Sequence, residues 1–453
     1  MNTRSSHMMT RSCLALLFLA GLAVGCSEKP KPAPVPVKSE AAAVDPDASL
    51  TANQKLALSK LSGVGGADNE VTAAQKNVRD NLAKDETWIA LGRAWIRKAR
   101  ESNDPGFYLN ADACAAVVLE REPNSALALN LRGLVHMNDH RFEEARDVAQ
   151  RILAKHADDP MAWGTLSDAY LELGRYDDAI EATQKMIDLK PNLPSYSRAA
   201  HLQWMRGDIG HAKQTVRNAI DAGRAAKRDP EPGAWVLVQA AMMFWNEGDY
   251  EGADAGFDKA LERIAEYAPA LVGKGRIAMA NGEPAKAADY FRRAYATSPL
   301  PETAWLLGDA KKAAGDADDA AKAYANLEKD GRRTDPRTLS LFYSTHAENT
   351  DDALALAREE YAKRKDVYSE DALAWALYRA GKLDEAKASI ARARRLGTPD
   401  ARLVYHDGAI RIAMGDVAKG RELVKQALKM NRAFDVTASK EATQLLNEKI
   451  AAR

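Results

Sequence analysis

Pairs of adjacent carboxylates are the residues of this chain of 453 amino acids whose types and spacing could do chemistry. Asp177-Asp178, Asp318-Asp319 and Asp351-Asp352 each stand at the turn before a predicted helix. Two neighbouring carboxylates could serve general acid–base catalysis. Acids at that place also interact favourably with the positive amino end of the helix dipole. Because the pairs recur at the same point of successive units, we interpret them as helix-start residues and not as a catalytic pair.

The other reactive residue types form no catalytic motif. The sequence contains no P-loop, nucleophile elbow, kinase signature or HExxH helix. Gly273-Lys274-Gly275 falls inside a predicted helix, and Cys13, Cys26 and Cys114 are too few for a disulfide framework or a cysteine zinc site. We therefore expect no enzyme activity, no metal site and no cofactor. Cys114 is expected to be a half-buried small residue, with a free reactive thiol as the alternative.

Composition narrows the class of protein. Lys and Arg total 64 and Asp and Glu total 64, so the net charge is zero, whereas a nucleic-acid binder usually has a basic excess. With 46% apolar and 28% charged residues, the chain can bury a core and is not globally disordered. Its length suits about three ordinary domains or one extended array.

The amino end is typical of a targeting segment. Residues 1–11 are basic and free of acids, and an apolar run over residues 13–24 follows that is shorter than the span of about 20 residues that a membrane helix needs. The run ends in Leu22-Ala23-Val24-Gly25-Cys26, which resembles the lipobox of bacterial lipoproteins, with Ala23 where leucine is commonest. The resemblance implies a lipoprotein signal peptide over residues 1–25 and lipidation of Cys26. An ordinary buried cysteine is the alternative.

Lipidation would place the protein in the cell envelope. Stable attachment to a lipid bilayer needs more than one acyl chain, since each buried methylene contributes about 0.8 kcal/mol. Ser27 stands where Asp would signal retention at the inner membrane, so the resemblance favours the outer membrane, facing the periplasm. Residues 26–48 form a Pro/Ala-rich linker, for which we expect an extended spacer. Whether translation starts at Met1, Met8 or Met9 stays open.

One motif repeats through the rest of the chain, and its clearest copy is residues 160–193. Trp163 and Tyr170 fall on one face of a predicted helix, Gly174 ends that helix, and Ala179 belongs to a second helix. This pattern resembles the tetratricopeptide repeat (TPR), a helix–turn–helix unit of about 34 residues. The resemblance implies an all-α fold, a right-handed superhelical solenoid of about ten TPR units.

The same frame extends over residues 85–435, after a helical lead-in at residues 49–84 and before a C-terminal capping helix at 436–453. Units are expected to start near residues 85, 126, 160, 194, 234, 268, 301, 334, 367 and 401. The unit near 334 lacks the turn glycine, so whether it is a true repeat stays open. Stacking is required because one unit alone leaves its apolar face exposed. The remaining repeat-defining packing residues are Pro191, Gly248, Ala253, Phe257, Gly282, Ala287, Phe291, Pro299, Gly308, Gly315, Ala320, Gly381, Ala386, Gly408 and Gly415.

The TPR resemblance also implies a concave groove, lined by four positions of each first helix. These positions hold the candidate groove residues Arg93, Asn130, Asp168, Arg198, Met242, Trp245, Arg276, Asp309, Trp375 and Tyr378. Four tryptophans at such positions, Trp235, Trp245, Trp305 and Trp375, are the candidate peptide anchors. Core packing of the tryptophans, and a plain solvated surface for the charges, are the alternatives. Some relatives clamp a peptide carboxylate with residues like Asn130 and Arg198, but Asp168 between them would repel it, so no clamp is expected.

These features favour a non-catalytic protein–protein interaction scaffold that docks a partner protein or peptide in its groove. The alternative is an accessory subunit of a cell-wall or polysaccharide synthesis and export system, which would contact glycan or its enzymes. The sequence leaves the partner, the envelope process and self-association open.

Overall fold

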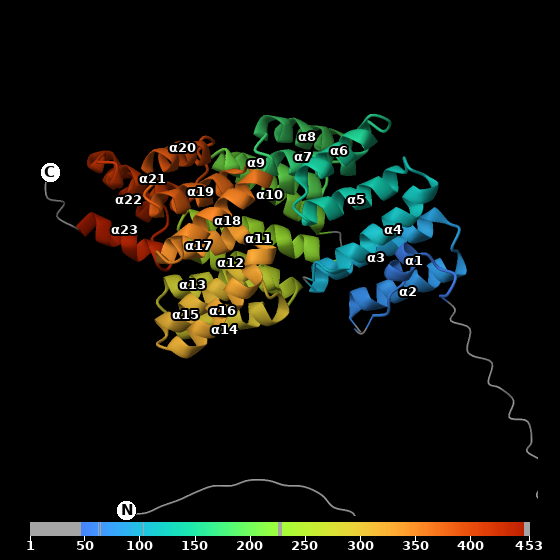
Figure 1. The fold of residues 1–453 in the computed structure, drawn as a ribbon, viewed down its shortest axis with the longest axis horizontal. Helices are drawn as coiled ribbons and strands as arrows, with labels where there is room; N and C mark the ends of the chain where they lie inside the picture. The colour runs from blue at the N-terminus through green and yellow to red at the C-terminus, as the bar shows by residue number, and fades with distance from the viewer. Residues whose placement is uncertain (1–46, 62, 64, 103, 225–228, 448–453) are drawn as a thin grey trace, which may run out of the picture. The chain divides into compact units, whose positions relative to one another are not determined.

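Helices packed in consecutive pairs form the described part of the chain, in which the computed structural model has no strand (Figure 1). The structure describes residues 47–61, 63, 65–102, 104–224 and 229–447. The chain divides into two units, Met1–Ser49 and Leu50–Arg453, and everything below concerns the second. The predicted signal peptide, the lipidation site Cys26 and nearly all of the linker lie outside the described residues.

Each repeat consists of a first and a second helix. The first helices are α3 (Asp85–Ser102), α5 (Ala126–Asn138), α7 (Pro160–Glu172), α9 (Leu193–Met205), α11 (Glu231–Asn246), α13 (Ala268–Ala280), α15 (Pro301–Ala313), α17 (Pro336–His346), α19 (Val367–Arg379) and α21 (Ala401–Ala413). The second helices are α4 (Phe107–Arg121), α6 (Phe142–Leu153), α8 (Tyr176–Leu189), α10 (Ile209–Gly223), α12 (Tyr250–Arg263), α14 (Pro284–Thr297), α16 (Ala317–Thr334), α18 (Thr350–Lys363), α20 (Leu383–Ala393) and α22 (Val417–Met430). The fold is therefore a helical solenoid, as the repeat pattern predicts.

Acids and capping residues begin these helices. The Asp159 carboxylate accepts hydrogen bonds from the backbone amides of Met161 and Ala162 at the start of α7. All three predicted carboxylate pairs lie in the first turns of second helices, α8, α16 and α18. Their interpretation as helix-start residues is confirmed, because the free amides and the dipole of a helix amino end favour negative charge there.

Small residues let the two helices of a unit, and neighbouring units, approach closely. A Cβ atom added at Gly275 in α13 would lie 2.4 Å from the Phe291 ring of α14, in the same unit. At Gly273 it would lie 2.3 Å from the Phe257 ring of α12, in the preceding unit. Both phenylalanines are fully buried. Gly273-Lys274-Gly275 is therefore a packing element of α13, which is its sequence interpretation.

From α5 onward, the turn between the helices of each unit holds a residue in the left-handed region. In the units near 194 and 334 this residue lies one place earlier than the repeat frame predicts, at Gly207 (φ +74°) and Ala347 (φ +56°). In the unit near 334 a left-handed alanine thus takes the place of glycine, followed by a second left-handed residue, Asn349 (φ +46°). Helices α17 and α18 still pack together as a pair.

Turns between helices in the first half of the array contact linkers between units in the second half. The backbone amide of Lys365, between α18 and α19, donates a hydrogen bond of 2.8 Å to the carbonyl oxygen of Glu172 at the end of α7. One unit further along on both sides, the Thr398 hydroxyl donates to the Met205 carbonyl at 2.7 Å. We call this contact the seam. In it the turns at Gly174, Gly207 and Gly248 lie against the linkers at Lys365, Gly397 and Met430, and we call each turn with its linker a rung.

The third rung of the seam is held by Asn431, which is fully buried. Its side-chain amide donates to the Trp245 carbonyl oxygen at 2.8 Å, and its carbonyl oxygen accepts from the Tyr250 hydroxyl at 2.7 Å. Apolar clusters also cross the seam, since Val367 belongs to the core built by Tyr176 and the helices α8 to α11. The units of α7–α8, α9–α10 and α11–α12 therefore each contact the unit five places later.

Short helices close the array. Helices α1 (Ala52–Ala57) and α2 (Gly66–Asp80) lie in the predicted lead-in, and α23 (Ala438–Asn447) lies in the predicted capping segment. Ala438 and Ala442 of α23 are buried in the last core cluster. Among the helices that the structure describes, none is both long and apolar enough to cross a bilayer.

Candidate partner-binding surfaces

Several charged residues predicted to line the groove form ion pairs with oppositely charged residues of the neighbouring unit. The Arg198 guanidinium of α9 makes two hydrogen bonds, 2.8 and 2.6 Å, to the Asp168 carboxylate of α7. This geometry explains why Asp168 can stand beside Arg198: the two charges join adjacent first helices and are not free for a ligand carboxylate. Arg276 lies 2.6 Å from Glu302 of the next unit in the same way.

Asn130 is buried as well, and its side-chain amide donates to Asp159 at 2.8 Å. Asp309 is buried, accepts a hydrogen bond of 2.6 Å from the Tyr324 hydroxyl of its own unit, and lies 3.4 Å from His346 of the next unit. A mixed-charge surface on first helices is thus used largely to tie one unit to the next.

Two of the tryptophans proposed as peptide anchors pack deep in the core. Trp245 is 3% exposed and Trp375 is completely buried, stacked 4.0 Å from the His406 ring and 4.7 Å from the Tyr378 ring. The expectation of exposed anchors at these two positions is wrong, because the seam and the next first helix cover them. Tyr378 and Met242 are half-buried, and Arg93 is the one exposed member of the candidate set.

Of the other two tryptophans considered as anchors, Trp305 is 7% exposed, so the expectation is wrong there too, whereas Trp235 is 43% exposed. Leu127 and Met161 are exposed at the same second position of their own first helices. The sequence shows this shared position, but not that the solenoid leaves it uncovered.

A buried charge network lies behind the first hydrogen-bonded rung of the seam. The Arg364 guanidinium is 2.6 Å from Glu172 and 3.6 Å from both Glu360 and Asp366. Arg337 of α17 lies 3.3 Å from Asp366. Burial and the nearby Asp366 charge raise the pKa of Glu172 to about 7, although Arg364 opposes them. Sequence reasoning missed this cluster because its members are up to about 190 residues apart.

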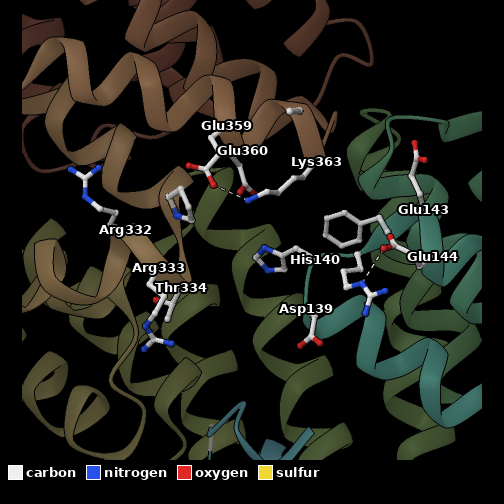
Figure 2. Close-up of a pocket in the computed structure, with 14 residues that line it drawn as sticks. Asp139, His140, Glu143, Glu144, Arg332, Arg333, Thr334, Glu359, Glu360 and Lys363 are labelled. Atoms are coloured by element: carbon white, nitrogen blue, oxygen red, sulfur yellow. Dashed lines mark hydrogen bonds and ion pairs between the residues drawn. The ribbon is translucent and has the colours of Figure 1, made fainter. Parts of the chain in front are cut away.

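A cavity of about 390 Å³ opens beside this network, between the α5–α6 turn and the ends of α16 and α18 (Figure 2). Its volume lies within the range of ligand pockets, about 300–1,000 Å³. The imidazole of His140 lies in the space between the two walls and stacks on Phe142. Burial and the positive charge of Arg364 lower the pKa of His140 to about 4, so the ring is neutral at pH 7.

Residues with catalytic or metal-binding potential are few elsewhere. Cys114 is completely buried, and burial raises the pKa of its thiol far above the usual range. It is therefore a core residue of α4, more buried than the half-buried position predicted, and its surroundings disfavour a reactive thiolate. The described ranges contain no cluster of three or more metal-ligating His, Cys, Asp or Glu side chains.

The family comparison agrees with the repeat frame. A family model described as tetratricopeptide repeat matches residues 106–160, 130–194, 238–300 and 372–431. Among curated proteins, the chain is 27% identical to the cellulose synthase operon protein C of Pseudomonas fluorescens (strain SBW25) over an alignment of 163 positions. That alignment covers 33% of this chain and 12% of the relative, so the chain spans only a small part of the relative's length.

Solved structures with similar architecture include PilW, a widely conserved type IV pilus biogenesis factor, at 16% identity and a TM-score of 0.39, covering 46% of this chain and 95% of PilW. A tetratricopeptide repeat protein from Parabacteroides merdae is 18% identical, with a TM-score of 0.40 and coverage of 52% and 89%. Tetratricopeptide repeats imply a protein-interaction scaffold. The segments 106–194, 238–300 and 372–431 of this chain are therefore tetratricopeptide repeats within a helical solenoid.

Proposed function

We propose that this protein is a non-catalytic scaffold that docks a partner protein, held in the bacterial outer membrane by acylated Cys26 and facing the periplasm. The observation that carries the proposal is the repeat array itself: paired helices repeat from α3 to α22, and residues 106–194, 238–300 and 372–431 among them match the tetratricopeptide repeat. Such arrays present extended surfaces for other polypeptides.

The anchoring part of the proposal rests on the lipobox-like segment before Cys26. Its test is metabolic labelling with a palmitate analogue in wild type, Cys26→Ala and Cys114→Ala. We expect label in wild type and in Cys114→Ala, whose cysteine is buried in α4, and none in Cys26→Ala. Equal labelling of wild type and Cys26→Ala, or no labelling of either, contradicts the anchor.

The docking part is tested by affinity purification of the full chain from crosslinked envelopes, before and after digestion of glycan. We expect the same protein partner in both samples, and we expect Arg93→Glu to reduce its recovery if the predicted concave groove is used. A partner that is recovered only from undigested envelopes contradicts direct protein docking.

A second candidate is an accessory subunit of a polysaccharide synthesis or export system. The partial similarity to a cellulose synthase operon protein favours it, although that similarity spans only 12% of the relative. Loss of the partner after glycan digestion, together with binding of purified oligosaccharide to the full chain, would support this candidate over the first.

A further inference from the structure

The seam has one rung that its own backbone does not close. At the three closed rungs, a Cβ atom on the turn glycine would lie 2.5 Å from the Lys365 carbonyl oxygen, 3.0 Å from that of Gly397 or 2.7 Å from that of Met430. Only a residue without Cβ permits this approach. The equivalent left-handed residue of the unit before Gly174 is His140 (φ +56°). It carries a side chain, and the cavity of Figure 2 lies between this turn and the ends of α16 and α18.

The two walls of this cavity carry opposite charge. The wall from the α5–α6 turn presents three carboxylates against one guanidinium, whereas the wall from α16 and α18 presents three cations against two carboxylates. Several of these charges are already paired within their own wall, as in the contact of 2.9 Å between Lys363 and Glu359. Glu143 on the first wall and Arg333 on the second are exposed, and neither has an ion pair with any residue that the structure describes.

We propose that this cavity is a docking site for an extended segment of a partner polypeptide that carries alternating basic and acidic side chains. Successive side chains of an extended segment point to opposite sides, so basic residues would face Glu143 and acidic residues would face Arg333. The neutral His140 ring between the walls can donate and accept one hydrogen bond each to a passing backbone.

Continuity with the seam favours a polypeptide over a glycan. At the first closed rung, the place opposite the turn is filled by the chain's own linker, and the Lys365 and Val367 amides donate to Glu172 and Tyr176. At the other two rungs, the linker side chains of Thr398 and Asn431 donate to carbonyl oxygens of the facing unit. A partner segment in the cavity would complete the open rung in the same manner. The inference rests on the proposed function of docking a partner protein and names where such a partner is held.

The test starts from a phage library of random linear dodecapeptides selected on the full chain, with cellohexaose as a parallel glycan probe. Dissociation constants of the selected peptides are then measured for wild type and variants. His140→Gly should let the linker close the rung, and Arg333→Glu should repel the acidic side chains; we expect each to weaken binding by about tenfold or more. Ala362→Trp, which fills the cavity from the α18 wall, should do the same.

Ala347→Gly is the matched control, because Ala347, like His140, is a left-handed residue other than glycine at a repeat turn, and it does not line the cavity. We expect it to bind as wild type does. Peptides that bind His140→Gly, Arg333→Glu and Ala362→Trp as tightly as wild type would overturn this site and leave the scaffold function standing. Selection of no peptide would count against both, and cellohexaose binding that these variants abolish would assign the cavity to glycan instead.

Discussion

The left-handed glycines of the repeat turns differ in what they must accommodate. Gly174, Gly207 and Gly248 need glycine for their positive φ and for the close approach of the opposite linker. Gly282 and Gly315 share the conformation but have no atom within 4 Å of a hypothetical Cβ. The same residue type at the same repeat position therefore has different structural importance.

This difference predicts unequal effects of alanine at Gly174 and Gly282. Both substitutions place a Cβ in the left-handed region, at about 1–2 kcal/mol. Gly174→Ala adds a clash with the Lys365 carbonyl oxygen at 2.5 Å, so it should cost about 1–3 kcal/mol more. Urea unfolding followed by circular dichroism measures both variants. Equal unfolding midpoints of the two variants would mean that the Lys365 linker moves away from the added Cβ at no cost in stability.

The raised pKa of Glu172 predicts that the stability of the folded chain depends on pH. Its pKa rises from an ordinary value of 4.5 to about 7 in the folded chain, so the folded state binds this proton more tightly than the unfolded state. The contribution of Glu172 to stability should therefore be greatest at low pH, fall between about pH 4.5 and pH 7, and stay constant above. The groups that face this carboxyl are Arg364, Arg337, Asp366, Glu360 and Tyr176.

The measurement compares wild type with Glu172→Gln across this range, because other groups titrate there too. Burial lowers the pKa of His140 and of His201, and their contributions to stability are lost as the pH falls below about 6.5. These contributions cancel in the difference between the two proteins. We expect Glu172→Gln to gain on wild type by about 1 kcal/mol or more between pH 5 and pH 7. A constant difference would show that Glu172 is ionised throughout.

At the scale of the element, the unit of α17 and α18 shows that the turn tolerates residues other than glycine. Ala347 ends α17 in the left-handed conformation, and its amide donates to the Ser344 carbonyl oxygen at 3.4 Å. The unit still pairs its helices because Ser340, at the small-residue position of α17, donates to the Ala353 carbonyl oxygen of α18 at 2.7 Å. Close packing at the helix crossing thus keeps the unit without the expected glycine.

Ala347→Gly is accordingly expected to stabilise this unit by about 0.5–1 kcal/mol, since glycine has no Cβ and adopts the left-handed conformation at a helix end without steric cost. Ala314→Gly is its control: Ala314 precedes the turn glycine of α15 and is right-handed (φ −79°), so glycine there should destabilise by a similar amount. Thermal unfolding of the two variants should give midpoint shifts of opposite sign. Shifts of the same sign would refute the conformational explanation.

At the scale of the whole array, the seam joins residues about 190 positions apart. Units that are not adjacent along the chain therefore contact and stabilise one another. Simple repeat arrays gain stability from adjacent units only. Here Asn431 binds both Trp245 and Tyr250 across the seam. Loss of the contacts at one rung should therefore lower the local stability of the other rungs.

Asn431→Ala tests this coupling by hydrogen exchange. The variant removes one hydrogen bond to the Trp245 carbonyl, which keeps its bond from the Gly248 amide, and the hydrogen bond of the Tyr250 hydroxyl, which together should cost about 1–3 kcal/mol. We expect faster exchange of the Lys365 and Val367 amides, two rungs away, and unchanged exchange in α14. Asn246→Ala, which removes a hydrogen bond within α11 only, should leave those amides unaffected. Unchanged exchange at Lys365 in Asn431→Ala would show independent rungs.

The sequence by itself determined the helix pairs, because their signals are local. Ala179 meets Ser167 within one repeat, and Phe257 and Phe291 meet glycines in an adjoining helix. Spacing along the chain is enough to predict such contacts. The carboxylate pairs were likewise interpretable, since helix capping involves only the next few residues.

Only the tertiary structure decided which surfaces remain open. The repeat pattern places Trp245 and Trp375 on a face that is concave in the family, but it contains no information on what the array does five units later. The seam buries Trp245, pairs Glu172 with Arg364 and leaves the cavity at His140. These outcomes depend on the accumulated curvature of many units, to which each packing contact adds a small rotation that no local spacing records.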